Sequence, residues 1–188
     1  METLEATPTT IKTTWNLDAI HSNLDFSVKH MMISNVRGNF KDFNVSIIAD
    51  DNDFSNAQIT VDINVDSIHT AQEQREAHLK SPDFFDTANF PMATFKSTSV
   101  EKNSEGEYKI HGDLTIKGIT KPVTVDAEFN GTGNDPYGNE KAGFDFKTVI
   151  NRADFGMNFN SPLEAGGVMV SDNVKISGGL ELVKQKEA

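Results

Sequence analysis

The sequence predicts an all-β protein, an extended eight-stranded antiparallel β-barrel with one short helix between strands near residues 71–81. Apolar and polar residues alternate along most of the chain, most clearly at residues 59–65, which is typical of strands with one buried and one solvated face. An open sheet of eight strands would expose its apolar face, whereas closure into a barrel buries that face and removes the edges. The longer runs, about eight to fifteen residues, suit an elongated barrel better than a sandwich.

Segments rich in Gly, Asn and Pro separate the alternating runs and predict mostly short turns. We expect a turn or bulge at Gly38 and Asn39, and a bend near Asp172 inside the last run. About eight strands are expected. The alternating runs lie at residues 13–17, 24–29, 43–47, 59–65, 93–99, 108–116, 123–129, 144–150 and 168–182.

One stretch departs from this pattern and predicts the helix. Thr70 provides an N-cap hydroxyl, and Glu73 lies three residues later, where its carboxylate can reach back in a capping box. The helix should therefore begin at Ala71. Because Pro82 disfavours helical backbone at the residue before it, the helix should end by residue 81, after about three turns.

The helix has the composition of a lid. Arg75, His78 and Leu79 have i, i+3 and i+4 spacing and share one face. Phe84 and Phe85 follow shortly after the helix. We expect these residues to close one end of the barrel, as a plug or gate and not as an active site.

The composition excludes several classes of protein. The 28 acidic and 17 basic residues give a formal charge of −11, which opposes binding to nucleic acid or to anionic lipid surfaces. The absence of cysteine excludes disulfides and thiolate chemistry. No run approaches the roughly 18 apolar residues of a membrane-spanning helix, so no stable membrane insertion is expected.

The chain is expected to hold a single domain. Residues 1–12 are polar and patternless and are expected to form a flexible tail, whereas residues 13–184 form the barrel. The N-terminus lacks the basic and apolar regions of a signal peptide, so a cytoplasmic location is expected unless a signal has been removed.

Motifs along almost the whole chain resemble the YceI-like family of lipocalin-like barrels. No single motif is decisive, but many occur in the right order between Trp15 and about Leu182. They are Trp15-x-x-Asp18, His21-Ser22, Phe26-x-Val28-x-His30-Met31, Val36-x-Gly38-x-Phe40, Ser67-Ile68-x-Thr70, Arg75, His78-Leu79-Lys80-Ser81, Asp83-Phe84-Phe85-Asp86, Phe90-Pro91, Phe95, Gly112-x-Leu114-Thr115-Ile116-x-Gly118-Ile119-Thr120-Lys121-Pro122-Val123 and Asn151-Arg152-x-Asp154-Phe155-Gly156. The family usually has Asp after the helix Arg, and we expect Glu76 at that position to change little.

The resemblance implies a non-enzymatic binding protein whose lumen holds one long amphiphile: a polyisoprenoid, an isoprenoid quinone, or a fatty acid or amide. It also implies a homodimer, and no cofactor other than such a lipid. Many family members are exported, and this chain shows no signal for export. The residues expected to contact the ligand are Phe26, Val28, His30, Phe40, Val45, Ile47, Val61, Ile63, Arg75, His78, Phe84, Phe85, Phe95, Leu114, Phe144, Phe146, Ile150, Arg152 and Phe155.

Two alternatives concern these residues. From periodicity alone, the Phe side chains would fill a solid core, and only the resemblance favours an open lumen. Arg75, His78 and Arg152 could hold a polar head group, but cations in an acidic protein more often pair with carboxylates such as Asp83, Asp86 or Asp154. Ion pairing is therefore the preferred interpretation for all three.

Catalytic and metal sites are weakly supported. His21 and Ser22 are adjacent, and neighbouring strand residues point to opposite faces, which disfavours a nucleophile–base pair. The five His residues lack metal-ligand spacing, so a metal site would need residues brought together by the fold. The alternatives to a lipid carrier are an enzyme acting on an isoprenoid-type lipid and a ligand-free structural or stress-response dimer.

Overall fold

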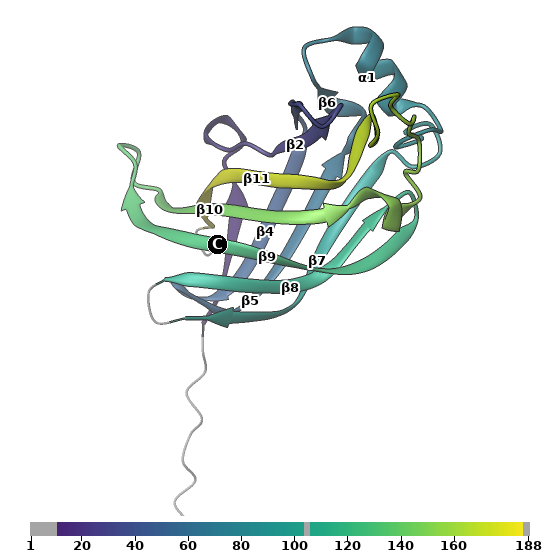
Figure 1. Cartoon of the computed structure of the whole chain (residues 1–188). Helices are drawn as coiled ribbons and strands as arrows, with labels where there is room; N and C mark the ends of the chain where they lie inside the picture. The colour runs from purple at the N-terminus through teal and green to yellow at the C-terminus, as the bar shows by residue number, and fades with distance from the viewer. Residues whose placement is uncertain (1–10, 104–105, 186–188) are drawn as a thin grey trace, which may run out of the picture.

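The structure, a computed structural model, describes residues 11–103 and 106–185 and forms a closed antiparallel β-barrel with one short α-helix (Figure 1). Residues 1–10, most of the predicted tail, lie outside the described residues. Eight strands form the ring in the order β1-β4-β5-β7-β8-β9-β10-β11, and pairing of β1 with β11 closes it. The predicted fold class is confirmed.

The elements have the following bounds. The strands are β1 Lys12–Leu17, β2 Asp25–His30, β3 Ser34–Phe40, β4 Phe43–Asp50, β5 Asp53–Asn64, β6 Ile68–His69, β7 Met92–Lys102, β8 Glu107–Ile116, β9 Ile119–Asn134, β10 Glu140–Asn151 and β11 Val170–Lys184. The helix α1 is Glu73–Lys80, and the 3₁₀ turns are η1 Ala19–His21, η2 Val65–Ser67 and η3 Arg152–Phe155.

Three positions in the barrel wall are each shared by two strands. β11 pairs with β2 along its first part and with β1 near its end, so β1 and β2 follow one another along the same neighbour. β3 and β4 pair with β2 and β1 in the same way, and β6 and β5 pair with β3 and β4. The eleven strand segments therefore occupy eight positions.

The two ends of the barrel differ. At one end, β6 pairs with β3, and β7 pairs only with β5 and β8, so β6 and β7 are not paired with each other. The segment between β6 and β7 carries α1 across this end (Figure 1). We call it the α1 end. The opposite end is filled by an aromatic cluster in which the Phe54 ring lies 5.5 Å from Trp15 and 4.9 Å from Phe144. No side-chain surface of Trp15 is exposed.

The predicted turn at Gly38 and Asn39 is wrong, because both residues lie inside β3. Gly38 pairs with Phe26 on β2, and the Phe26 ring lies over it so closely that a Cβ atom there would stand 2.5 Å from the ring. Glycine is needed here for close approach and not for a turn. The chain reverses instead at residues 31–33.

The predicted bend in the last strand is confirmed. Pairing of β11 with β2 shifts register between Val170 and Val174, on either side of Asp172. Such a bulge bends the strand and increases its twist. Among the described residues, no helix is long and apolar enough to cross a membrane.

Candidate functional site

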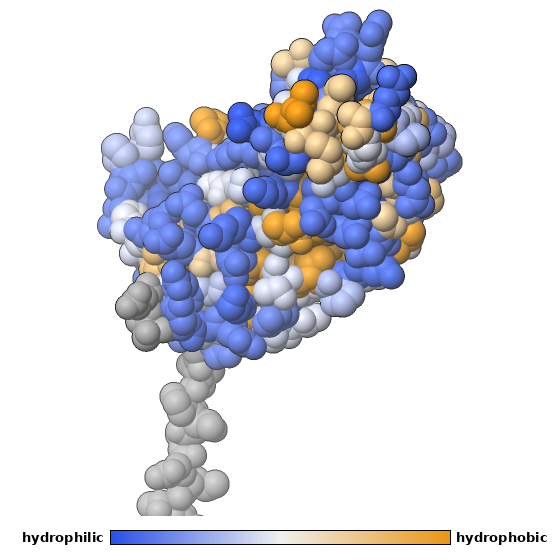
Figure 2. Space-filling view, viewed as in Figure 1, coloured by the Kyte–Doolittle hydropathy of each residue, from blue (hydrophilic) through white to orange (hydrophobic). Residues whose placement is uncertain are grey.

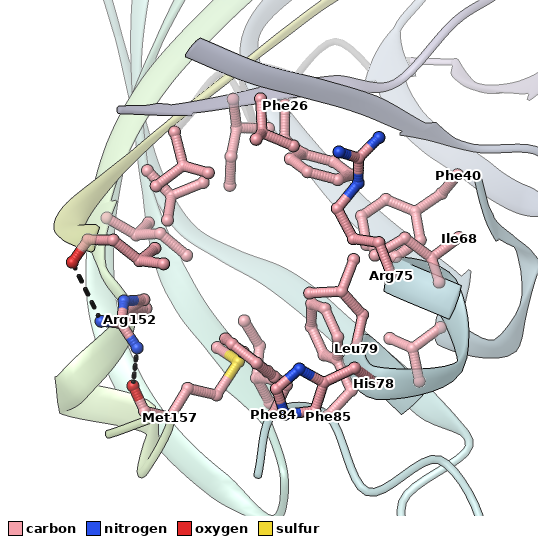
Figure 3. Close-up of a pocket in the computed structure, with 18 of the residues that line it drawn as sticks. Phe26, Phe40, Ile68, Arg75, His78, Leu79, Phe84, Phe85, Arg152 and Met157 are labelled. Carbon is pink, nitrogen blue, oxygen red and sulfur yellow. Dashed lines mark hydrogen bonds between the residues drawn. The ribbon is translucent and has the colours of Figure 1, made fainter. Parts of the chain in front are cut away.

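A cavity of about 450 Å³, the upper cavity, lies at the α1 end of the barrel (Figure 3). Apolar side chains from β2, β3 and β11 form much of its wall, and α1 and the loop after it cover it. The polar or charged residues that line it are His30, Gln72, Gln74, Arg75, His78 and Arg152. The site is therefore an apolar space whose polar groups lie at α1, at the C-terminal end of β2 and just after the C-terminal end of β10.

A second cavity of about 150 Å³, the lower cavity, lies between the upper cavity and the aromatic cluster. Tyr108 and Thr148 are the only lining residues with polar side chains. Four residues line both cavities: Leu24, Ile63, Leu114 and Ile176. These four side chains form the boundary at which the two spaces adjoin.

The structure distributes the predicted ligand-contacting residues over both cavities. Those lining the upper cavity alone are Phe26, Val28, His30, Phe40, Arg75, His78, Phe84, Phe85, Ile150 and Arg152. Those lining the lower cavity alone are Val45, Ile47, Val61, Phe95, Phe144 and Phe146, and Ile63 and Leu114 line both. The alternation along the strands therefore identified the inward face.

Phe155 is the exception, since it lines neither cavity. It is 1% exposed and packs in the core with Val65, Ile116 and Met157. Phe155 was expected to line the lumen because it is one of the Phe residues and belongs to a motif of the resemblance. It lies in the 3₁₀ turn η3, where side chains do not alternate between two faces as they do in a strand.

The predicted start of the helix is also wrong. Ala71 has φ 58°, which is incompatible with a right-handed helix, and α1 begins at Glu73. The N-cap is Gln72, whose side-chain oxygen accepts a hydrogen bond from the backbone N–H of Arg75. The end is as predicted, because Ser81 is the C-cap and Pro82 follows it.

Glu76 anchors the segment that leads into α1. Its carboxylate accepts hydrogen bonds from the backbone N–H of Thr70 at 2.6 Å and of Gln72 at 3.4 Å, and it lies 3.2 Å from the His69 ring nitrogen. The Thr70 amide is the main cause that lowers the pKa of Glu76 below its usual value. The expectation that Glu in place of Asp changes little stays a prediction, and the contacts show that the carboxylate at this position has an anchoring role.

Arg75 stabilises the same segment from the cavity side. Its Nε donates to the Thr70 hydroxyl at 3.0 Å, and one Nη donates to the Thr70 carbonyl at 2.6 Å. The ion pair that we preferred from the sequence is absent among the described residues. The guanidinium still faces the upper cavity, and two such bonds leave some of its five N–H donors for another partner (Figure 3).

His78 holds the C-terminal part of α1 to the neighbouring loops. Its ring contacts Phe84 and Phe159 edge to face, with ring centres 5.1 and 4.6 Å apart, and its Nε2 lies 2.8 Å from the Asp83 carboxylate. The predicted pairing with Asp83 is confirmed. No residue of α1 is fully buried, so the helix is held by these few contacts and not by a packed face.

Arg152 is a structural residue of the cavity wall. It is 3% exposed and donates hydrogen bonds to the carbonyls of Met157 and Phe159, at 2.6 and 2.9 Å, with further bonds to Ser171 and Val170. Asp172 lies 3.4 Å away, in place of the expected Asp154. Burial lowers the pKa of Arg152. These bonds fold the loop from η3 to β11 against the barrel (Figure 3).

A polar cluster unrelated to the cavities joins η1 to β10 and β11. Asp18, His21 and Glu181 converge with the spacing of metal ligands, but the Lys141 ammonium contacts both carboxylates, at 2.7 Å from Glu181. The hydrogen bond from Lys141 is the main cause that lowers the pKa of Asp18 to about 2. A lysine thus provides the positive charge that a metal would supply.

Sequence reasoning missed part of the upper cavity. Met157, Phe159 and Met169 line it from the loop between β10 and β11, and Gln72 and Gln74 line it beside Arg75. These residues lie outside the strands, so no periodicity indicated which way their side chains point. The Phe-rich composition was the only signal for Phe159.

The fold and the site define a class of protein: a closed antiparallel barrel with two adjoining apolar cavities beneath a short, partly buried helix. The model of the YceI-like domain matches residues 15–182, so the chain belongs to the YceI-like family. A UPF0312 protein of Staphylococcus aureus strain N315 is 45% identical over 170 residues, which are 90% of this chain and 96% of that protein.

Solved structures support the assignment. BcnA of Burkholderia cenocepacia is 25% identical, with a TM-score of 0.76 over 88% of this chain and 98% of that one. The YceI protein of Campylobacter jejuni is 34% identical, with a TM-score of 0.72 over 85% and 90%. A domain from Saccharophagus degradans, described as polyisoprenoid binding, shares the fold at 16% identity and a TM-score of 0.65, over 91% and 98%.

Proposed function

We propose that this protein is a lipid-binding protein that sequesters or carries one long-chain amphiphile, such as a polyisoprenoid, an isoprenoid quinone, or a fatty acid or amide. The observation that carries the proposal is the pair of adjoining apolar cavities inside a barrel with one covered end and one aromatic-filled end. The description of the Saccharophagus domain as polyisoprenoid binding supports the same class of ligand.

The lining supports a ligand with one polar end. The tail would lie along the boundary residues into the lower cavity, and each buried methylene contributes about 0.8 kcal/mol. The head group would lie near Arg75 and Gln74, the polar side chains of α1 that line the upper cavity beside His78. An apolar wall selects the length and width of a chain and not its chemistry, so the proposal names a class of lipid.

The structure favours binding over the two alternatives. Arg75 and His78, the side chains that an enzyme acting on the lipid would use, are engaged in contacts that hold α1 and its neighbouring segments in place. A ligand-free dimer predicts an exposed apolar patch and no cavity, and the two cavities count against it. We propose a homodimer as the family resemblance implies, and light scattering of the purified chain measures that state.

The test is to identify what the protein binds. Native mass spectrometry of the purified chain should show an added mass, and solvent extraction should release a lipid with a long apolar chain. If none co-purifies, farnesol, palmitic acid and a short-tailed ubiquinone should each be titrated, and at least one should bind with one-to-one stoichiometry. A chain that carries no lipid and binds none of these probes would contradict the proposal.

A further inference from the structure

Exposed apolar side chains are concentrated at the α1 end of the barrel. Among the described residues, seven of the twelve exposed large hydrophobic residues lie in the turns and strand ends there: Met31, Met32, Ile33, Phe90, Met92, Ile119 and Val168. Figure 2 shows apolar surface beside α1 at this end. Single exposed apolar residues are normal, but a group at one end marks a contact surface.

The most prominent group is the turn between β2 and β3. Met31, Met32 and Ile33 are 43%, 53% and 83% exposed, and the N–H of Ile33 donates to the His30 carbonyl to close the turn. We call residues 31–33 the apolar tip. Val168 lies beside it, because the N–H of Met31 donates to the Met169 carbonyl at 2.8 Å.

The backbone of the apolar tip is unusual for its sequence. Met31 and Met32 have φ of 52° and 62°, in the left-handed region where tight hairpin turns normally place Asn, Asp or Gly. Those residues would relieve the strain and also make the turn polar. Methionine at both positions leaves the backbone strain unrelieved and presents large, flexible apolar side chains to solvent.

The apolar tip borders the upper cavity. His30, immediately before it, and Met169 and Val170, on the neighbouring strand and loop, all line that cavity. A partner surface that contacted the apolar tip would therefore face the α1 end of the barrel, where α1 covers the upper cavity. The position links the tip to movement of a ligand into or out of the barrel.

The charges around the apolar tip indicate what it contacts. Glu164 is the only charged residue in segments 31–36 and 160–170, although the whole chain has a net charge of −11. Behind the tip, Lys29 and Arg37 are exposed on the outer faces of β2 and β3, and neither forms an ion pair with another described residue. By strand rise, Lys29 lies roughly 7 Å from Met31 and Arg37 roughly 13 Å from Ile33, because Lys29 pairs with Asn35 and Arg37 pairs with Ser27, further down the hairpin.

We propose that the apolar tip inserts into a neutral, zwitterionic lipid bilayer and that Lys29 and Arg37 then meet the phosphates of the head groups. The inference rests on the proposed lipid-binding function, because it identifies the surface at which that ligand is exchanged. An interfacial segment inserts about 5–10 Å, and the backbone of Lys29 lies at that depth from the tip, whereas Arg37 lies further away and would reach the head groups through its long side chain. The contact places the covered opening of the upper cavity against the bilayer.

The test is flotation of the full chain with phosphatidylcholine vesicles. The wild-type chain should float with the vesicles, and Ile33→Ser should lower its partition coefficient about tenfold, because burial of this side chain drives insertion. Ile20→Ser is the matched control. Ile20 is the same residue type and is 89% exposed, but it lies in η1, away from the tip, so its substitution should leave flotation unchanged.

A reporter variant tests insertion directly. The chain has a single Trp, Trp15, which is fully buried, so Ile33→Trp adds one exposed indole. Emission from this variant should shift to shorter wavelength on addition of vesicles and should be quenched by brominated phosphatidylcholine. Circular dichroism establishes that each variant is folded.

Lipid content measured by native mass spectrometry on the same samples separates this inference from the proposed function. A chain that carries lipid but fails to float would overturn the membrane contact and leave lipid binding intact. Equal loss of flotation in the Ile33 and Ile20 variants would also overturn it. If Ile33→Ser instead converts a dimer to a monomer without changing flotation, the tip is a subunit contact and the inference is wrong. Flotation that needs Ile33 in a chain without lumen lipid would support the membrane contact alone.

Discussion

At the scale of single residues, the site is organised by polar side chains that satisfy the backbone of loops. Arg152 binds carbonyls of the segment after η3, and Glu76 binds amides of the segment before α1. Sequence patterns identified both residues as polar members of motifs, but not these partners. The partners lie in irregular segments whose positions depend on the whole fold, so no local spacing predicts them.

Removal of the Arg152 side-chain charge should destabilise the fold. Arg152→Met leaves the carbonyls of Met157 and Phe159 buried without their donor, and we expect a loss of about 3–5 kcal/mol in the free energy of unfolding. Urea denaturation measures this. Arg37→Met is the control, since Arg37 is exposed and its substitution should change stability by less than about 0.5 kcal/mol.

Asp18 gives the fold a specific acid sensitivity. Lys141 lowers the pKa of Asp18 from 3.8 to about 2 in the folded state, so the stabilisation is complete above pH 3.8 and is lost as the pH falls through 2. Unfolding curves measured between pH 5 and pH 2 should therefore show a steeper loss for wild type than for Asp18→Asn. Parallel pH dependences for the two proteins would contradict this assignment.

At the scale of elements, α1 is a cover held by a few anchors. None of its residues is fully buried, and it is fixed by Glu76 at its start and by His78 near its end. The sequence predicted the existence of this helix, its C-terminal boundary and its position over the barrel. It misplaced the start by two residues, because Ala71 has a left-handed backbone, the N-cap is Gln72 and Thr70 binds Glu76 instead of capping the helix.

Loss of the Glu76 anchor should loosen this cover. In Glu76→Ala the amides of Thr70 and Gln72 lose their acceptor, so hydrogen exchange at residues 70–81 should become faster while exchange in the barrel strands stays the same. Glu73→Ala is the matched control, since Glu73 lies on the exposed first turn of the same helix. Equal acceleration in both variants would show that Glu76 has no special role.

Pairs of a glycine and a phenylalanine on neighbouring strands keep the lumen open. Gly38, Gly112 and Gly178 lie so close to inward Phe rings that a Cβ atom would collide with them, which means that the rings lie flat along the wall. The sequence left open whether the Phe residues fill or line the barrel. Whether a ring lines the wall depends on which glycine of the neighbouring strand it covers. The strand register determines this pairing, and the sequence alone does not give the register.

Substitution of such a glycine should therefore be costly. Gly38→Ala forces the Phe26 ring off the wall, and we expect a loss of about 1–3 kcal/mol in stability together with weaker lipid binding. Gly133→Ala is the control, because Gly133 lies in β9 with no atom within 4 Å of its added Cβ. Thermal unfolding and lipid titration measure both effects, and equal behaviour of the two variants would contradict this account.

At the scale of the whole molecule, the two cavities divide the lumen at Leu24, Ile63, Leu114 and Ile176. The alternation of apolar residues predicted the barrel and about eight strands, and all but Phe155 of the residues expected to contact the ligand line a cavity. It gave no indication of where the lumen narrows, because a boundary arises from side chains of strands far apart in sequence. It also gave no indication that the loop with Met157 and Phe159 lines the upper cavity.

Narrowing this boundary should shorten the bound lipid. Leu114→Phe places a larger side chain between the two cavities, so the upper cavity should still bind lipid but with shorter chains than in wild type. Extraction followed by mass spectrometry gives the chain-length distribution. Val149→Phe, on an exposed position of β10, should leave that distribution unchanged, and an unchanged distribution in Leu114→Phe would show that the lower cavity takes no part.

The aromatic cluster of Trp15, Phe54 and Phe144 blocks the end opposite α1, and this has a kinetic consequence. Under the proposed function, lipid would enter and leave at the α1 end alone, so the bound lipid would have to depart before its replacement arrives. Exchange is then sequential, and its rate at high concentration of incoming lipid is set by departure alone. A competing lipid should therefore not accelerate release of the lipid that is already bound.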